Sequence, residues 1–332
     1  MSHEFSASRY DAMSHRRCGR SGLLLPLISL GAHQTFGGYR DAGVARDCLF
    51  RAFDMGITHF DFANNYGRPP GNAETVCGSI IKEMPRDELI ISSKAGYTMW
   101  PGPYGDGGSK KYIIASCDQS LKRMGLEYFD IFYHHRPDSE TPLEETLGAL
   151  DLLVCQGKAL YIGISNYSGS QFAQATQVCE RHGLAPITVV QPRYNLRSRG
   201  IEWDLLPQTE RAGSGVMAFG ALAGGLLSDK YLRGDIPPQS RAAQLLGKEW
   251  VEKALNETLR PALVSLNEMA LARGQSLAQM ALAWVLRLPA VTSALIGASS
   301  VRQIEENVAA LGKLDFTEDE LRRIDELMPR NP

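Results

Sequence analysis

The segment HFDFANNYGRPPG, residues 59–71, changes character halfway along its length. Residues 59–62 have the pattern of a buried strand, and residues 64–71 carry the Asn, Gly and Pro residues typical of a loop. A carboxylate such as Asp61 is unusual at the end of a buried strand, and Tyr66 follows it in the loop. The segment therefore indicates a strand that ends in polar side chains at the start of a loop.

The same strand-to-loop pattern recurs along the chain, alternating with helix-like stretches. After a predicted hairpin over 16–25, we predict strands over 28–31, 57–62, 88–93, 129–134, 160–164, 187–191, 215–219 and 292–296. Predicted helices cover 44–55, 73–83, 109–124, 142–156, 168–181, 203–211, 276–286 and 301–311. Such alternation implies a parallel sheet with right-handed crossovers. About eight units without a linker predict a (β/α)8 TIM barrel that forms one domain over residues 1–332.

The competing fold is an open, doubly wound sheet. Such a sheet usually carries a GxGxxG loop after a strand, and the sequence has none. It also lacks a P-loop, an HExxH motif and a GxSxG motif. Two long loops, 99–108 and 228–247, follow the third and seventh barrel strands, and we expect them to be functional.

Composition excludes several classes of protein. Lys and Arg total 35 and Asp and Glu total 37, so the net charge of −2 argues against binding to nucleic acids or to a membrane surface. Six scattered cysteines form no CxxC pair, which argues against a zinc site or a disulfide framework. No apolar run reaches the roughly 18 residues of a membrane span. We therefore expect a cytoplasmic protein with reduced thiols.

Ionisable side chains follow three consecutive predicted barrel strands. Asp61 and Tyr66 follow the second strand, Lys94 the third and His135 the fourth. Active sites of (β/α)8 barrels lie at this end of the strands, so we expect the four side chains to converge. His134 should face away from the mouth because neighbouring residues of a strand point to opposite sides. We expect His33 and His59 to be structural histidines with satisfied hydrogen bonds.

These residue types suit proton donation to an oxygen. A free tyrosine has a pKa of about 10, and a neighbouring lysine ammonium is expected to lower it by stabilising the phenolate. A buried Lys94 needs an anion, which Asp61 supplies. A neutral His135 can hydrogen-bond a substrate carbonyl. The set has no nucleophile, metal site or carboxylate pair, so it fits a reaction in which a hydride attacks the carbon.

The motifs DFANNYG, SSKAG, DIFYHHRPD, GISNYS and VVQPRYN resemble, in this order, those of the aldo-keto reductases. GGLLSDKY and LIGASSVRQIEEN resemble that family's cofactor-binding segments, so the resemblance covers nearly the whole chain. The start RYDAMSHRRCGRSG and the stretch MWPGPYGDGGSKKY resemble one branch in particular. That branch contains potassium-channel β-subunits and bacterial glyceraldehyde 3-phosphate reductases, of which the bacterial reductases are the more similar.

The resemblance implies a (β/α)8 barrel, NADP(H) as cofactor, and reduction of small aldehydes and ketones. It implies a catalytic tetrad of Asp61, Tyr66, Lys94 and His135. The residues that it implies for the nicotinamide carboxamide are Ser165, Asn166 and Gln191, with Phe219 stacking on the ring. For the rest of the cofactor it implies Leu222, Gly224, Leu226, Lys230, Arg241, Gly297, Ser299, Gln303, Glu306 and Asn307. Trp100 is our candidate for a wall of the substrate pocket.

The sequence departs from the family pattern at two places. Residues 298–300 read Ala-Ser-Ser where many reductases have a basic residue for the 2′-phosphate, which bears on the preference for NADPH. Gly220 and Ala221 stand where relatives commonly have a Ser/Thr-Pro pair.

Two functional classes stay open at this stage. The first is a reductase of small aldehydes, with glyceraldehyde 3-phosphate and methylglyoxal as candidate substrates. The second is an NADP(H)-binding regulatory subunit, like the channel β-subunits, with little turnover. The branch resemblance implies a homo-oligomer, either a tetramer or an octamer. The intact tetrad favours the reductase.

Overall fold

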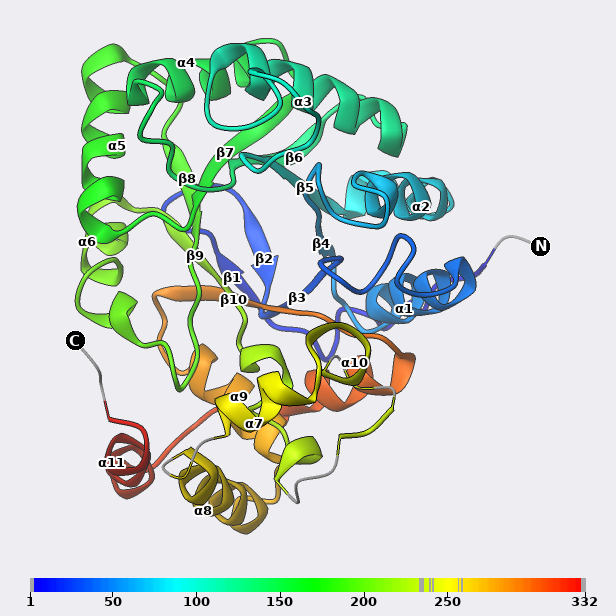
Figure 1. Cartoon of the computed structure of the whole chain (residues 1–332), viewed down its shortest axis with the longest axis vertical. Helices are drawn as coiled ribbons and strands as arrows, with labels where there is room; N and C mark the ends of the chain where they lie inside the picture. Colours follow the sequence, from blue (N-terminus) through cyan, green and yellow to red (C-terminus); the bar gives the residue numbers. More distant parts are fainter. Residues whose placement is uncertain are drawn as a thin grey trace.

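Eight parallel strands close into a barrel in a computed structural model of the chain, which describes residues 3–232, 236–238, 240, 242–255, 257 and 259–329. Neighbouring strands pair in the order β10-β3-β4-β5-β6-β7-β8-β9 (Figure 1). Their bounds are β3 (Ile28–Gly31), β4 (His59–Asp61), β5 (Ile90–Ala95), β6 (Phe129–His134), β7 (Ala159–Ser165), β8 (Ile187–Gln191), β9 (Gly215–Phe219) and β10 (Val291–Ile296). The predicted (β/α)8 barrel is confirmed.

Helices surround the barrel, and each strand is connected to the next through at least one of them (Figure 1). Those that the sequence predicts are α1 (Ala42–Asp54), α2 (Asn72–Ile81), α3 (Lys110–Met124), α4 (Leu143–Cys155), α5 (Gly169–His182), α6 (Leu206–Ala212), α9 (Leu277–Leu286) and α10 (Val301–Val308). Capping fixes several of their ends. The Ser168 side chain accepts from the Gln171 backbone at the start of α5, and Gly183 ends the helix in the left-handed conformation.

Two helices between β9 and α9 were not predicted: α7 (Lys248–Ala254) and α8 (Leu259–Ala272). The buried residues of α8 are Ala262, Leu263, Leu266 and Ala270, a spacing of three and four that indicates an amphipathic helix. The pattern was therefore present in the sequence. A last helix, α11 (Glu318–Leu327), follows α10 and packs against α8.

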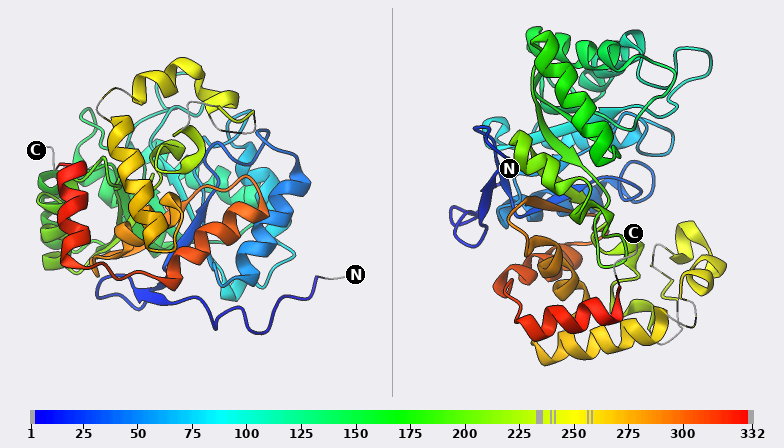
Figure 2. Two further views of the ribbon diagram at one scale, coloured as in Figure 1. Left: turned by 90° about the horizontal axis from the view of Figure 1, so that it is seen from below. Right: turned by 90° about the vertical axis from the view of Figure 1, so that its left-hand side faces the viewer.

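The N-terminal hairpin closes one end of the barrel. It consists of β1 (His15–Arg17) and β2 (Leu24–Pro26), which pair antiparallel. Its Cys18, Leu23 and Leu25 form one apolar cluster with side chains from the strands, Ile131, Tyr133, Val189 and Met217. Figure 2 (right) shows the hairpin on one side of the molecule and α7 on the opposite side. The open end of the barrel is therefore the end at which the strands finish.

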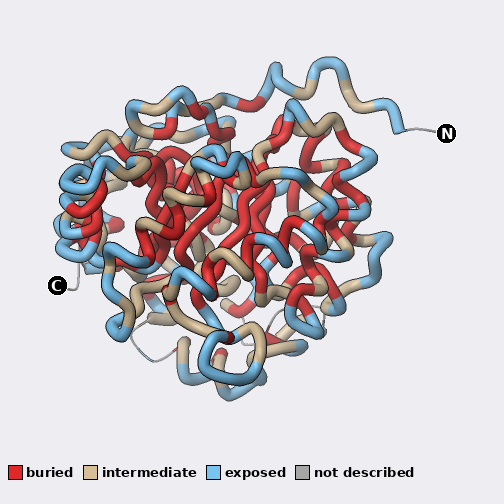
Figure 3. The backbone as a smooth tube through the Cα atoms, turned by 90° about the horizontal axis from the view of Figure 1, so that it is seen from above, coloured by how far each residue is buried: buried red, intermediate tan, exposed pale blue. Residues whose placement is uncertain are grey.

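Each strand contributes to two separate environments because successive side chains point to opposite faces. Ile131 and Tyr133 of β6 belong to the interior cluster with the hairpin, whereas Phe132 between them belongs to the larger cluster that includes the surrounding helices. Figure 3 shows the buried strands at the centre and exposed backbone at the periphery. This alternation decides which strand residues can reach the open end from inside the barrel.

The packing of α2 against α3 generates a first prediction. A Cβ added at Gly78 in α2 would lie 2.5 Å from Met124 Cα at the end of α3, so we expect Gly78→Ala to lower the free energy of unfolding by about 1–3 kcal/mol. A Cβ at Gly148 in α4 meets nothing within 4 Å, so Gly148→Ala should raise it by up to about 1 kcal/mol. Thermal and urea denaturation measure both. Equal melting temperatures for the two variants would contradict the packing argument.

Candidate active site

A buried ion pair lies at the open end of the barrel. Lys94 of β5 and Asp61 of β4 are both almost completely buried, and Lys94 Nζ lies 2.5 Å from Asp61 Oδ2. Nζ also donates to the Phe62 carbonyl oxygen at 2.6 Å. Asp61 Oδ1 accepts from Ser92 Oγ at 2.7 Å and from Gln191 Nε2 at 3.1 Å. Burial lowers the pKa of Lys94, and the Asp61 carboxylate counteracts that effect.

Tyr66 lies next to this ion pair on the loop after β4. The ring of Tyr66 is half-buried, and its centroid lies 5.1 Å from Lys94 Nζ. The pKa of Tyr66 is raised well above its usual value, because burial disfavours the phenolate and the Asp61 carboxylate repels it. The net shift is therefore opposite to the lowering that we expected, because burial and the Asp61 carboxylate outweigh an ammonium that is directed at Asp61 and the Phe62 carbonyl. The phenol keeps its proton at neutral pH.

His135, directly after β6, faces Tyr66. The Tyr66 hydroxyl lies 3.5 Å from His135 Nε2, and the buried Nδ1 has no hydrogen-bond partner among the described residues. The pKa of His135 lies well below its usual value because burial, and then the nearby Lys94 ammonium, disfavour the imidazolium. A neutral imidazole and a protonated phenol thus stand side by side. Together they can hold a carbonyl oxygen and donate a proton to it.

The structure brings all four residues of the predicted tetrad together, and it adds neighbours that the sequence analysis did not assign. Tyr97 meets the His135 ring edge to face with 4.7 Å between centroids. The Arg136 guanidinium stacks over Tyr97 and pairs with Asp106 at 2.8 Å, which ties the loop after β5 to the site. Arg136 is adjacent to His135 in the sequence, and this adjacency was the available signal.

His33 is the clearest error among the predicted histidines. We expected a structural histidine, but the residue is exposed and its ring centroid lies 4.8 Å from that of Tyr66. It follows β3 by two residues, so a search of strand ends that included the first barrel strand would have found it. By contrast, His134 is buried and hydrogen-bonds the Tyr167 hydroxyl through Nδ1 at 2.7 Å, as expected of a residue facing away from the mouth.

Residues matched to the nicotinamide carboxamide lie beside the tetrad at the ends of β7 and β8. Ser165 Oγ donates to the Gln191 carbonyl oxygen at 2.8 Å, and Asn166 Nδ2 donates to the His135 carbonyl oxygen at 3.0 Å. Asn166 has a positive φ of 61°, which turns its side chain out of the strand direction. Its Oδ1 receives no hydrogen bond from the described residues, and it can therefore accept from an amide NH₂. These residues fit a carboxamide.

The other cofactor candidates lie on two neighbouring segments after β9 and β10. Ala223, Gly224 and Gly225 all have positive φ, so the turn after Phe219 is tightly curved. The first segment carries Phe219, Leu222, Gly224, Leu226 and Lys230, and the second carries Gly297, Ser299, Gln303, Glu306 and Asn307. These assignments stay predictions.

Some of these candidates contact other side chains, and others are exposed. Both the backbone NH and the hydroxyl of Ser299 donate to Gln303 Oε1, at 3.0 and 3.3 Å. Glu306 pairs with Arg302 at 2.7 Å, and Lys230 is exposed. Arg241 lies outside the described residues.

Trp100 packs against helix α3, with 5.2 Å between its ring centroid and that of Tyr112. The Tyr112 hydroxyl in turn donates to the Tyr97 carbonyl oxygen at 2.5 Å. Tyr97, rather than Trp100, is therefore the aromatic residue that the structure places against the tetrad. A role of Trp100 in the substrate pocket stays a prediction.

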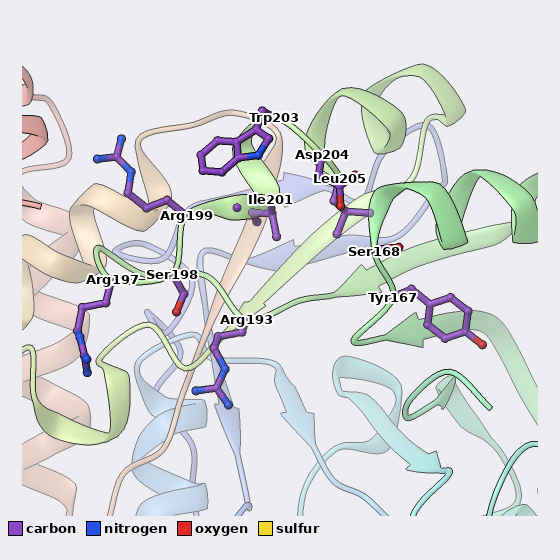
Figure 4. Close-up of a pocket in the computed structure, with 11 residues that line it drawn as sticks. Tyr167, Ser168, Arg193, Arg197, Ser198, Arg199, Ile201, Trp203, Asp204 and Leu205 are labelled. Carbon is purple, nitrogen blue, oxygen red and sulfur yellow. The ribbon is translucent and has the colours of Figure 1, made fainter. Parts of the chain in front are cut away.

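A cleft of about 500 Å³ is lined mainly by the loop after β8 (Figure 4). None of its lining residues belongs to the tetrad, but Tyr167 follows Asn166 directly and Arg193 stacks on Phe219. Arg199 pairs with Glu202 and Asp325. Figure 4 shows Arg193 and Arg197 extending to the opposite side of this loop from Arg199. Arg193 and Arg197 form a positive rim of the cleft and have no ion pair among the described residues, while Asp204 also lines the cleft.

A family model for the aldo/keto reductase family matches residues 27–329. The chain belongs to the aldo-keto reductase family. It is 52% identical over 324 residues to L-glyceraldehyde 3-phosphate reductase of Escherichia coli K12, covering 96% of this chain and 93% of that protein. It is also 34% identical over 329 residues to a probable voltage-gated potassium channel subunit beta of Arabidopsis thaliana, covering 96% and 99%. A rice protein of the same description is 37% identical over 305 residues, covering 90% and 91%.

These similarities confirm the predicted family and branch. This aldo-keto reductase is an oxidoreductase of a family that generally uses NAD(P)H to reduce carbonyl groups. Within the described residues, no group of His, Cys, Asp and Glu side chains could hold a metal ion. Nor does the described part of the chain include a helix that is long and apolar enough to cross a bilayer.

The Asp61–Lys94 pair generates a stability prediction. Lys94→Met leaves a buried carboxylate without its cation, which should lower the free energy of unfolding by about 3–5 kcal/mol. In the double variant Asp61→Leu/Lys94→Met no charge is left uncompensated, so it should unfold later in urea than Lys94→Met. If the double variant were the less stable of the two, the carboxylate would not be the source of the cost.

His134 generates a prediction of pH-dependent stability. Burial lowers its pKa to about 4, whereas the unfolded chain has the usual value near 6.5. The unfolded state therefore binds the proton first, so this stability is present above pH 6.5 and is lost as the pH falls toward 4, by about 3 kcal/mol. His134→Asn should weaken this dependence in urea unfolding at pH 4.5–7. The exposed His182→Asn is the control and should follow the wild type.

Proposed function

We propose that the chain is an NADPH-dependent reductase of small aldehydes and ketones in which Tyr66 is the general acid. The contact between the Tyr66 hydroxyl and His135 Nε2, 3.5 Å apart beside the Asp61–Lys94 pair, carries this proposal. Both groups can form hydrogen bonds to the same carbonyl oxygen. The carboxamide candidates Asn166 and Gln191 contact His135 and Asp61, so the nicotinamide would lie next to that oxygen.

The charge and protonation state of each residue determine its role in the proposed reaction. When bound, NADPH supplies the hydride that reaches the carbonyl carbon. As negative charge develops on the carbonyl oxygen, His135 stabilises it by a hydrogen bond and Tyr66 donates its proton to it. The Lys94 ammonium then stabilises the phenolate of Tyr66, and Asp61 keeps that ammonium charged in its buried place. Water restores the proton on Tyr66 after product release.

Among candidate substrates, we place a phosphorylated triose before methylglyoxal. The Escherichia coli relative is named for L-glyceraldehyde 3-phosphate. The rim formed by Arg193 and Arg197 supplies positive charge next to the site without an acidic partner among the described residues. Arginine guanidinium groups match the geometry of phosphate oxygens. Ser299, just before α10, and Gln303 in its first turn are our candidates for the 2′-phosphate of NADPH, together with Lys230 and Arg241.

A second function rests on the plant relatives, which are described as potassium channel β-subunits. As a regulatory subunit, the protein would respond to bound NADP(H) rather than catalyse its turnover. It would act as a homotetramer or octamer. The intact tetrad favours the enzyme, because a binding subunit does not need a proton donor at the mouth.

Oxidation of NADPH at 340 nm tests the proposal with wild type and Tyr66→Phe side by side, on glyceraldehyde 3-phosphate, methylglyoxal and glyceraldehyde. We expect Tyr66→Phe to lower kcat by at least about 100-fold, since a positioned general acid contributes roughly 10²–10⁴-fold. Cofactor fluorescence should show unchanged NADPH binding. NADH, used as the second cofactor, measures the contribution of the 2′-phosphate contacts.

Three results would revise this picture. Equal rates for wild type and Tyr66→Phe would exclude Tyr66 as the acid. Tight NADPH binding without turnover on any aldehyde would favour the regulatory subunit. Equal kcat/KM for glyceraldehyde and its 3-phosphate would remove the proposed role of the arginine rim.

A further inference from the structure

The Asp61 carboxylate is one end of a row of buried hydrogen bonds that crosses the barrel interior. Ser293 Oγ lies 2.8 Å from Ser29 Oγ, which lies 3.0 Å from His59 Nδ1. His59 Nε2 lies 2.9 Å from Ser92 Oγ, which donates to Asp61 Oδ1 at 2.7 Å. All five side chains are almost completely buried. The row therefore runs, without solvent, over four neighbouring strands, β10, β3, β4 and β5.

Strand geometry explains why these residues meet. His59 and Asp61 are two residues apart on β4 and therefore point to the same face. Ser92 and Lys94 have the same relation on β5, and Asp61 is the direct partner of Ser92 in the register. Within each strand, the first polar residue lies one inward-facing position further from the open end: His59 precedes Asp61, and Ser92 precedes Lys94. His59 contacts Ser92, and Ser92 contacts Asp61.

The ion pair fixes the direction of every hydrogen bond in the row. An ionised carboxylate only accepts, so the single hydroxyl proton of Ser92 points to Asp61. Ser92 must then accept from His59, which places the imidazole proton on Nε2. Burial lowers the pKa of His59 to about 4, so Nδ1 carries no proton and accepts from Ser29. The hydroxyl of Ser293 donates to Ser29 in turn.

We propose that His59 is a positioning residue for the reduction: through Ser92 it orients the Asp61 carboxylate and thereby holds Lys94 beside Tyr66. The proposal rests on the function proposed above, because it gives His59 a part in that reaction. No atom of His59 needs to touch the substrate. A row of hydrogen bonds that all point toward one carboxylate polarises each member and favours the charged form.

The charged and titratable groups around Asp61 determine the direction of the expected pH effect. They are Lys94 from β5, His59 from its own strand, Tyr66 from the following loop and Tyr133 from β6. Loss of the donor Ser92 removes a hydrogen bond that only the ionised carboxylate accepts, and thus support for the charged ion pair with Lys94. The acid limb of kcat should therefore move to higher pH.

The first test compares two serines that are adjacent on β5 and equally buried. Ser92 belongs to the row, whereas Ser93 points the other way and donates to Glu74 Oε1 at 2.6 Å. We expect Ser92→Ala to lower kcat at neutral pH by about tenfold, the size of a lost hydrogen bond to a charged group, and to shift the acid limb. Ser93→Ala should leave the acid limb in place. Superimposable pH profiles of the two variants would overturn the proposal, whatever their melting temperatures.

A second test uses His59 itself. His59→Leu fills the volume without a polar atom and should shift the acid limb like Ser92→Ala. His59→Gln retains a donor where Nε2 lies, so it should restore the position of the limb at least in part. A merely structural histidine would give two variants that differ in stability but not in pH profile, which would contradict the proposal.

The third test reads the hydrogen-bond direction without turnover. Nitrogen-15 NMR of the resting wild-type protein should show the His59 proton on Nε2. With seven histidines in the chain, the signals can be assigned by their loss in His59→Gln. A proton on Nδ1 would overturn the proposal. A wild type that binds NADPH but turns over no aldehyde would instead contradict the proposed function. The His59 tautomer would still show in which direction the hydrogen bonds between Ser293 and Asp61 run.

Discussion

The Asp61–Lys94 ion pair is the interaction on which the rest of the site depends. Two opposite charges taken out of water are tolerated only when both are close and fully hydrogen-bonded. Here the Phe62 carbonyl, Ser92 and Gln191 provide the remaining hydrogen bonds from three different strands and loops. The pair therefore requires the closed barrel. Inside the barrel, the pair is stable only at the C-terminal ends of the strands, where these hydrogen-bonding groups meet.

Electrostatics at the mouth follow from this pair and from burial. The Asp61 charge and desolvation keep Tyr66 protonated, and desolvation and Lys94 keep His135 neutral. A proton donor and a neutral imidazole side by side suit a carbonyl oxygen better than a carboxylate or a phosphate.

Much of the fold and the tetrad could be predicted because the relevant signals are local. A strand such as 129–134 has its own pattern, and Gly183 marks a helix end by its own conformational freedom. What could not be predicted depends on distant partners. The pKa of Tyr66 rises because burial and the Asp61 carboxylate disfavour its phenolate. His33 reaches the mouth because of a loop path that its own residue type does not determine.

The hairpin at the closed end has a consequence for how the chain folds. Its side chains contact Val189 and Met217, the backbone NH of Arg20 donates to the Gly213 carbonyl, and Arg16 donates to the carbonyl oxygens of Leu286 and Val291. These partners lie about 170 to 275 residues further along the chain, and contacts of such separation form late. The hairpin is thus among the last segments to reach its native place. Until then, the floor of the barrel stays exposed to water.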